Sequence, residues 1–185
     1  MAKFSPLQQE NTGVLLIDVQ EKLFPYVENS CHVMMKMQQA ISGCQILNLP
    51  ILVSEQYPEK LGGTLPSLKG ILGEGQSYLS KCEFSCLGNQ SIKETVDAFQ
   101  RKQWIVLGIE AHVCVLQTVR DLLQAEYQVT VLNDAISSRS IYDFSTAIAE
   151  MRDMGARISS TETILFEILK TSKASAFKEI SRLIK

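Results

Sequence analysis

The sequence predicts an α/β protein with a central, mainly parallel six-stranded sheet covered by helices on both faces. Short continuous apolar runs, typical of strands buried on both sides, alternate with segments whose apolar residues recur every three or four positions. Such alternation requires right-handed crossovers, which join parallel strands. The expected architecture is therefore a three-layer, Rossmann-like fold.

Six apolar runs account for the expected strands. The first ends in the carboxylate of Asp18, the third is the weakest, and the fourth is apolar throughout and the clearest. Turn-forming residues separate these runs from the helical segments. The expected strands cover residues 13–18, 51–55, 77–81, 104–109, 129–132 and 156–159.

Helical periodicity fills most of the space between these strands. The first helix ends before Pro50, because proline cannot continue the hydrogen-bond ladder. Residues 57–75 hold Pro58, Pro66 and five of the ten glycines, which predicts a long loop with room for one helical turn. The expected helices cover residues 31–49, 92–100, 115–125 and 141–155, with two short ones within 161–185.

Length and composition predict one ordered domain spanning residues 1–185. The chain has 185 residues, of which 45% are hydrophobic and 21% charged, and its mean hydropathy is +0.05. Lys and Arg total 18 against 20 Asp and Glu, a net charge of −2. This charge provides no basic field for a phosphate backbone, so we expect no nucleic acid partner and disfavour a nuclease.

The distribution of apolar and cysteine residues indicates the compartment. Residues 1–12 are polar, and no apolar run approaches the roughly 18 residues of a membrane helix, so we expect neither a secretory leader nor a membrane anchor. The five cysteines form an odd set without a repeated spacing. This usage fits a reducing compartment, and we expect a cytoplasmic protein.

Three reactive side chains follow predicted strands, at the edge of the sheet where ligands bind in such folds. They are Asp18, Lys81 and Cys114. Each alone has an ordinary explanation as a turn former, a solvated lysine or a small core residue. Together they predict a reactive thiol, because a helix start and an ammonium lower a thiol pKa and a carboxylate can accept its proton.

Three segments in order along the chain carry a family resemblance. They are LLIDVQ at residues 15–20, SKCEFS at 80–85 and GIEAHVCV at 108–115, and they resemble the isochorismatase-like cysteine hydrolase superfamily. The resemblance runs from about Thr12 to the last helix. SEQYP at 54–58 and DAISSR at 134–139 look like the isochorismatase domain-containing branch, whose substrate is generally unassigned.

The resemblance implies a mechanism for a small-molecule substrate. Asp18 matches the general base, Lys81 the lysine of the triad and Cys114 the nucleophile that forms a thioester with an amide, ester or related carbonyl. It also implies a cis peptide at Ile109-Glu110 and an oxyanion hole formed by the backbone N–H groups of Glu110 and Cys114. A homo-oligomer is expected, because members commonly form dimers or larger rings. A non-catalytic small-molecule or protein-binding module on the same fold remains the alternative.

No metal or other cofactor is expected. Nicotinamidases of the superfamily carry a metal-binding aspartate and histidines after the second strand, where this chain has no histidine. Cys82 and Cys86 flank Glu83, but two thiols lack further ligands, which favours a structural role. His112 precedes Cys114 by two residues, and residues at that spacing point in different directions on a helix, which disfavours it as a base.

Four further residues are candidates for contact with the substrate: Gln20, Phe24, Tyr57 and Phe84. We expect Gln20 also to orient Asp18. Core packing explains the two phenylalanines equally well, because pockets and cores use the same residue types. Glu55 and Arg139 either face the substrate or form surface ion pairs.

Overall fold

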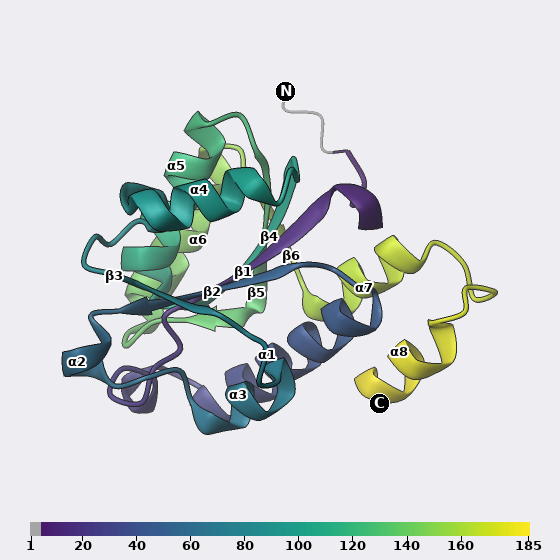
Figure 1. Ribbon diagram of the computed structural model, residues 1–185, viewed down its shortest axis with the longest axis horizontal. Helices are drawn as coiled ribbons and strands as arrows, with labels where there is room; N and C mark the ends of the chain where they lie inside the picture. Colours follow the sequence, from purple (N-terminus) through teal and green to yellow (C-terminus); the bar gives the residue numbers. More distant parts are fainter. Residues whose placement is uncertain (1–4) are drawn as a thin grey trace.

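The computed structural model describes residues 5–185 (Figure 1). Residues 1–4, which form part of the polar segment on which the expectation of no leader rests, lie outside the described residues. The α/β architecture predicted from the sequence is confirmed, with one six-stranded sheet between two layers of helices. Among the helices of residues 5–185, none is long and apolar enough to cross a membrane.

All six strands of the sheet are parallel, in the order β3-β2-β1-β4-β5-β6. The chain runs outward from β1 to β3 and then returns to place β4 on the other side of β1. Ligands bind in such sheets beside the point where the strand order reverses, here at the carboxyl ends of β1 and β4. The strands are β1 (Thr12–Ile17), β2 (Ile51–Gln56), β3 (Tyr78–Lys81), β4 (Gln103–Ile109), β5 (Gln128–Ser137) and β6 (Arg157–Ser159).

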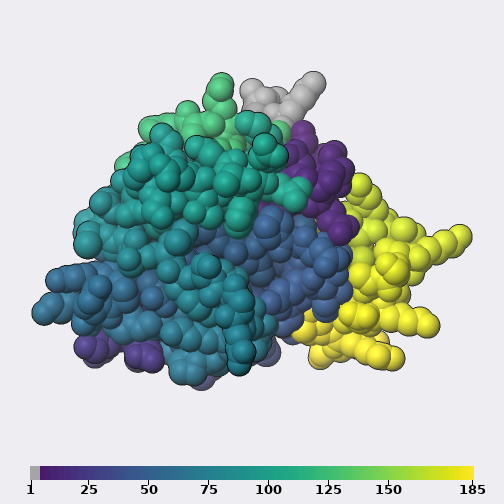
Figure 2. All heavy atoms as spheres, viewed as in Figure 1, coloured from purple at the N-terminus to yellow at the C-terminus, as the bar shows by residue number. Residues whose placement is uncertain are grey.

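Helices cover both faces of the sheet, as expected. Figure 1 shows α4, α5 and α6 on one face and α1, α3, α7 and α8 on the other, and in Figure 2 the C-terminal segment forms one edge of the packed molecule. The helices are α1 (Ser30–Ile46), α2 (Pro58–Leu61), α3 (Pro66–Leu72), α4 (Gln90–Ala98), α5 (Leu116–Gln124), α6 (Ile141–Asp153), α7 (Thr161–Leu169) and α8 (Phe177–Ile184).

The central strand β1 explains why its sequence is continuously apolar. Val14 and Leu16 face the layer that contains α1 and α7, while Leu15 and Ile17 face the layer that contains α4 and α5. All four side chains are fully buried, because successive strand residues point to opposite faces and both faces are covered. The two apolar cores fix the sheet and hold its carboxyl edge in place.

Two segments differ from the sequence-based expectation. Residues 57–75 form two short helices, α2 and α3, rather than a loop with one turn, and each begins with a proline, whose fixed φ suits the first helical position. Strand β5 extends five residues beyond the expected end at Leu132, to Ser137, and its pairing with β4 shifts register between Val106 and Gly108. The irregular pairing continues β5 past its apolar run and toward the ligand-binding edge.

Gly108 is required where β4 pairs with Ile17, the last residue of β1. Its φ is +126°, and a Cβ at this position would lie 2.2 Å from the carbonyl oxygen of Ile17. The next peptide bond, Ile109-Glu110, is cis, as the resemblance implies. The chain then enters a π-helical turn, η4 (Ala111–Val115), that leads into α5.

Candidate active site

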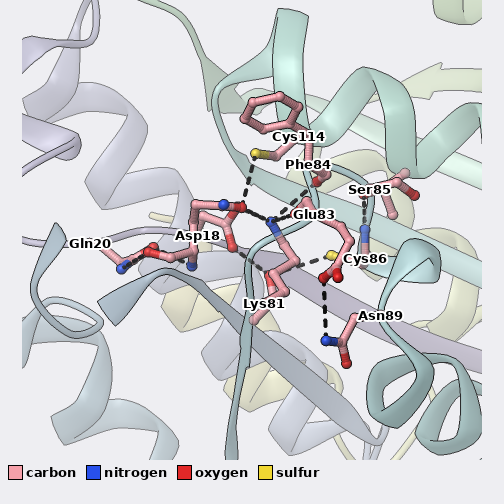
Figure 3. A network of polar contacts seen from close by, with 12 residues as sticks. Asp18, Gln20, Lys81, Glu83, Phe84, Ser85, Cys86, Asn89 and Cys114 are labelled. Atoms are coloured by element: carbon pink, nitrogen blue, oxygen red, sulfur yellow. Dashed lines mark hydrogen bonds and ion pairs between the residues drawn. The ribbon is translucent and has the colours of Figure 1, made fainter. Parts of the chain in front are cut away.

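A buried ion pair joins the ends of β1 and β3 (Figure 3). Asp18 directly follows β1 at a φ of +53°, and its backbone N–H donates to the carbonyl of Ser54, 3.1 Å away. Lys81 is the last residue of β3, and its Nζ lies 2.7 Å from Oδ2 of Asp18. Both side chains are completely shielded from solvent. The parallel strands thus bring together two charges that are 63 positions apart in the chain.

Hydrogen bonds hold both charged groups in place. Lys81 Nζ also donates to Oε1 of Gln56 at 2.6 Å and to two backbone carbonyls, those of Glu83 and Phe84, each at 3.2 Å. Burial lowers the pKa of Lys81, but the charge and hydrogen bond of Asp18, together with the nearby Cys86 and Cys114, outweigh this effect and leave the pKa above its ordinary value. Oδ1 of Asp18 accepts from the Ser54 hydroxyl at 2.7 Å. The lysine therefore stays protonated.

Cys114 lies within η4, at the entry to α5, and is 6% exposed. Burial raises the pKa of its thiol well above the ordinary value, and the charge of Asp18 and a hydrogen bond to it raise the pKa further, while Lys81 lowers it. The expectation of a depressed thiol pKa is therefore wrong. The sequence showed a helix start and an ammonium, but not the burial, nor that Asp18 already neutralises that ammonium.

Gln56 belongs to this cluster and was missed in the sequence. It ends β2, and its Oε1 accepts from both Lys81 Nζ, at 2.6 Å, and the Cys114 thiol, at 3.9 Å. Its Nε2 donates to the carbonyl of Cys82 at 2.8 Å. The position after the second strand was the available signal, since β2 lies between the strands that carry Asp18 and Lys81.

Gln20 does not orient Asp18, contrary to expectation. Its Nε2 donates to the carbonyls of Gln56, at 2.9 Å, and Gly62, at 2.6 Å, and its Oε1 accepts from the N–H of Gln56 at 2.7 Å. Both amide hydrogens are thus used, and the side chain is fully buried. Figure 3 shows it directed away from the ion pair. Gln20 instead holds the end of β2 in place through its hydrogen bonds to the main chain of Gln56.

The three aromatic candidates lie in different environments. Phe24 is buried in the apolar core on the α1 side of the sheet, so of its two expected roles the structure favours core packing. Tyr57 and Phe84 are 45% and 54% exposed. Tyr57 and Lys81 both line a cavity of about 290 Å³, together with Pro58, Glu59, Ser80, Cys82, Glu83 and Asn89. This cavity lies against β3 at Lys81, and Asp18 and Cys114 are not among the residues that line it.

Glu55 and Arg139 have partners outside the Asp18-Lys81-Cys114 cluster. The Glu55 carboxylate accepts from the N–H of Thr64 at 2.6 Å and from its hydroxyl at 2.7 Å, so it holds the segment between α2 and α3. Arg139 Nε lies 2.8 Å from Oε1 of Glu110, in an ion pair with an exposed guanidinium. Arg139 thus forms the ion pair given as its alternative role, whereas Glu55 is buried and hydrogen-bonded to Thr64 rather than part of a surface ion pair.

His112 and Cys86 occupy structural positions, whereas Cys82 lines the cavity beside Lys81. His112 Nδ1 lies 2.9 Å from the Ser138 hydroxyl, a bond that turns the ring toward β5. Cys86 is buried, with its thiol 3.5 Å from the Ser54 hydroxyl, and burial raises its pKa to about 11, whereas Cys82 is exposed. Across residues 5–185, no group of three or more His, Cys, Asp or Glu side chains is arranged to hold a metal ion.

The strand order and the matching solved structures place the protein in the class of α/β proteins with the isochorismatase fold. The family model described as the isochorismatase domain matches residues 12–163, so the chain belongs to the isochorismatase family.

Similar proteins agree with this assignment. Isochorismatase domain-containing protein 2 of Danio rerio is 34% identical over 185 residues, covering 100% of this chain and 92% of the relative. A Caenorhabditis elegans structure described as MAR1 ribonuclease has a TM-score of 0.92 and 34% identity, covering 97% of this chain and 92% of that one. The Escherichia coli YcaC gene product, described as an octameric hydrolase of unknown specificity, shares the fold at a TM-score of 0.93 and 19% identity, covering 100% and 91%.

Proposed function

We propose that this protein is a cysteine hydrolase that cleaves a small amide, ester or related carbonyl compound through a thioester on Cys114. The observation that carries the proposal is the fully buried Asp18-Lys81 ion pair beside that thiol. Buried ion pairs add little net stability compared with apolar residues of similar volume. A role in acid–base chemistry at the neighbouring sulfur accounts for this buried pair better than a contribution to stability does.

Acylation begins from the neutral thiol, because the pKa of Cys114 is raised. The sulfur attacks the substrate carbonyl carbon while Asp18 takes the thiol proton, so one S–C bond forms and the carbonyl oxygen becomes an oxyanion. The intermediate collapses, the C–N or C–O bond breaks, and the leaving amine or alcohol takes the proton from Asp18. A thioester on Cys114 remains.

Deacylation uses the same carboxylate in the same two roles. Asp18 removes a proton from water as the water oxygen attacks the thioester carbonyl. The C–S bond then breaks, and the proton held by Asp18 returns to the sulfur. Lys81 keeps its charge throughout and holds Asp18 in position through the 2.7 Å contact.

The oxyanion is assigned to two backbone N–H groups, those of Glu110 and Cys114. Both belong to the turn between β4 and α5, where the N–H groups at the start of a helix are available to an anion. Loss of one oxyanion donor in other hydrolases costs roughly 3–4 kcal/mol of transition-state stabilisation. Tyr57 and Phe84, both exposed beside the cluster, are assigned to substrate contact.

Intact-protein mass spectrometry tests the proposal directly. The protein is incubated with a panel of small amides, esters and thioesters, and we expect an acyl adduct on Cys114 together with release of the acid. Cys114→Ala abolishes both signals, and Cys31→Ala, which removes an exposed thiol, is the matched control. Hydrolysis that survives in Cys114→Ala would remove the sulfur from the mechanism.

Two other functions are tested in the same panel. A binding module would give thermal stabilisation by a panel compound without product release. RNA hydrolysis is the second candidate, favoured by the description of the C. elegans structure as a ribonuclease. Cleavage of labelled RNA by the wild type and not by Asp18→Asn would replace the small-carbonyl substrate with RNA.

We also propose a cytoplasmic homo-oligomer. The five cysteines are all free, which fits a reducing compartment. The octameric state named for the E. coli structure supports self-association. Light scattering on the purified protein measures the assembly, and a monomer at micromolar concentration would exclude it.

A further inference from the structure

We propose that Gln56 is a positioning residue of this site, which holds the Cys114 thiol and the Lys81 ammonium through one amide oxygen. The inference deepens the proposed function and rests on it, because it assigns the group that fixes the nucleophile before reaction. Gln56 lies at the carboxyl end of β2, between the strands that carry Asp18 and Lys81.

A single oxygen makes both contacts. Oε1 of Gln56 is 2.6 Å from Nζ of Lys81 and 3.9 Å from Sγ of Cys114. An amide oxygen has two lone pairs and can accept from both donors at once. The thiol has one hydrogen and two acceptors, this oxygen and the Asp18 carboxylate. Gln56 thus holds the thiol in the resting site, and Asp18 takes its proton in the reaction.

The surroundings of Gln56 fix the orientation of its amide. Nε2 faces the carbonyl oxygen of Cys82 at 2.8 Å, and a carbonyl can only accept, so the amide oxygen must be the atom that faces Lys81. Gln20 makes reciprocal bonds with the main chain of Gln56, at 2.7 Å to its N–H and 2.9 Å to its carbonyl. Gln20 thus holds the main chain of Gln56, and the bonds of the Gln56 amide to Cys82 and Lys81 hold the side chain.

This arrangement predicts opposite effects for two substitutions. Gln56→Glu has nearly the same shape but places a negative charge beside the thiol, which disfavours the thiolate and moves the reactivity of Cys114 to higher pH. Gln56→Leu removes the oxygen that accepts from the neutral thiol, so the neutral form of Cys114 loses a hydrogen bond. It also leaves the Lys81 ammonium with one partner fewer, which strengthens its effect on the sulfur. Both changes favour the thiolate and move the reactivity of Cys114 to lower pH. A purely structural role would move both variants in the same direction or leave the profile unchanged.

The test is the rate of iodoacetamide alkylation of Cys114 against pH, measured by peptide mass spectrometry on the full chain. At pH 8 we expect alkylation roughly tenfold slower in Gln56→Glu and faster in Gln56→Leu, since the thiolate fraction changes tenfold per pKa unit. Gln76→Glu and Gln76→Leu are matched controls. Gln76 is also half-buried and donates to main-chain carbonyls, those of Ile51 and Ser77, so its variants leave the profile of Cys114 unchanged.

The outcomes separate this proposal from the proposed function. Profiles of both Gln56 variants within about twofold of wild type would overturn the role of Gln56, whatever the rate of hydrolysis. If the alkylation profiles of the two Gln56 variants shift in opposite directions, the role of Gln56 is supported. If wild type and Cys114→Ala hydrolyse the substrate equally well in the same experiment, the cysteine mechanism is rejected while the role of Gln56 stands. Circular dichroism checks folding. If Gln56→Leu is unfolded, an unshifted profile in Gln56→Glu alone overturns the proposal.

Discussion

Asp18 controls Cys114 from a position without solvent contact. Its carboxylate raises the pKa of the thiol and pairs with the one ammonium that would lower it. The electrostatics of the cluster therefore favour the protonated sulfur. A base that touches the thiol matters more in such a site than a thiolate formed in advance.

Asp18→Asn is expected to make the thiol more reactive and, under the proposed mechanism, to slow hydrolysis. Loss of the negative charge lowers the pKa of Cys114, so alkylation at pH 8 becomes faster, by roughly tenfold for each pKa unit. Hydrolysis of any substrate found in the panel falls by about 10²–10⁴-fold because the base is gone. Alkylation of exposed Cys31 in the same sample is the internal control. Slower alkylation of Cys114 would contradict the electrostatic account.

Sequence could predict the cluster in part. Asp18 and Lys81 were predicted to meet because the carboxyl ends of parallel strands share one edge. Gln56 was missed because an amide lacks the charge or nucleophilicity that marks a reactive residue in a sequence. The pKa of Cys114 was assigned the wrong direction because burial and pairing arise only when the chain folds.

The start of helix α7 depends on a residue from another element. Ser160, which precedes the helix, provides no side-chain cap, and Asp134 of β5 accepts instead from the N–H and the hydroxyl of Thr161, at distances of 3.0–3.1 Å. A carboxylate at a helix N-terminus accepts hydrogen bonds from the free N–H groups there and interacts favourably with the positive end of the helix dipole. The irregular second half of β5 thus fixes α7 on the sheet.

Asp134→Ala is expected to lower the free energy of unfolding by about 1 kcal/mol, and up to about 2 kcal/mol, through loss of this cap. Urea denaturation followed by circular dichroism measures the change. Asp153→Ala, on the exposed end of α6, is the matched control and leaves stability within about 0.5 kcal/mol. Equal stability of Asp134→Ala and wild type would show that Thr161 finds another acceptor.

The ion pair between β6 and α7 makes stability depend on pH. Arg157 donates to both oxygens of Glu167, at 2.6 and 2.5 Å, and these bonds hold the pKa of Glu167 below its ordinary value of 4.5. A lowered folded-state pKa stabilises the fold above the unfolded value, and that contribution disappears as the pH falls through the folded value. The backbone N–H of Leu7 also donates to Glu167, at 2.7 Å.

Glu167→Gln is therefore expected to unfold at lower urea than wild type at pH 7. The difference in free energy of unfolding between wild type and Glu167→Gln narrows as the pH falls through the acidic range, because the wild-type carboxylate loses the charge that the variant already lacks. Urea titrations at several pH values from 7 to 3 measure it. A difference that stays constant over this range would assign the effect to packing.

Local pattern predicted the start and end of most strands better than it predicted the Pro- and Gly-rich segment between β2 and β3. The apolar runs of β1 and β4 showed their burial directly, because both faces of the sheet are covered. Helices α2 and α3 were missed because Pro and Gly occur both in loops and at helix ends. Only contacts with the rest of the molecule, such as those of Glu55 with Thr64, distinguish these cases.

At the scale of the whole molecule, the pairing of β1 with β4 sets the distance between Asp18 and the turn that holds Cys114. Gly108 allows this close approach, since its backbone lies where any Cβ would contact Ile17. The same two strands carry Asp18 and the turn that holds Cys114. A change in their spacing would therefore disturb both the fold and the candidate active site.

Gly108→Ala is expected to destabilise the protein strongly. The positive φ alone costs about 1–3 kcal/mol, and a Cβ 2.2 Å from a backbone oxygen cannot be accommodated without moving a strand. Gly70→Ala is the control. It lies in α3 with no atom near its Cβ, so it should be neutral or stabilise by up to about 1 kcal/mol. Thermal unfolding measures both, and a Gly108→Ala protein as stable as wild type would contradict the strand geometry.

The 2.7 Å pairing of Lys81 with Asp18 also affects how molecules arrive at the site. The two charges cancel and the neighbouring thiol is neutral, so this cluster itself contributes almost no net charge, and the remaining charges that line the cavity are those of Glu59 and Glu83. An uncharged ligand should then bind at a rate set by diffusion and fit, nearly independent of ionic strength. The site therefore distinguishes one ligand from another by shape and hydrogen bonding after contact.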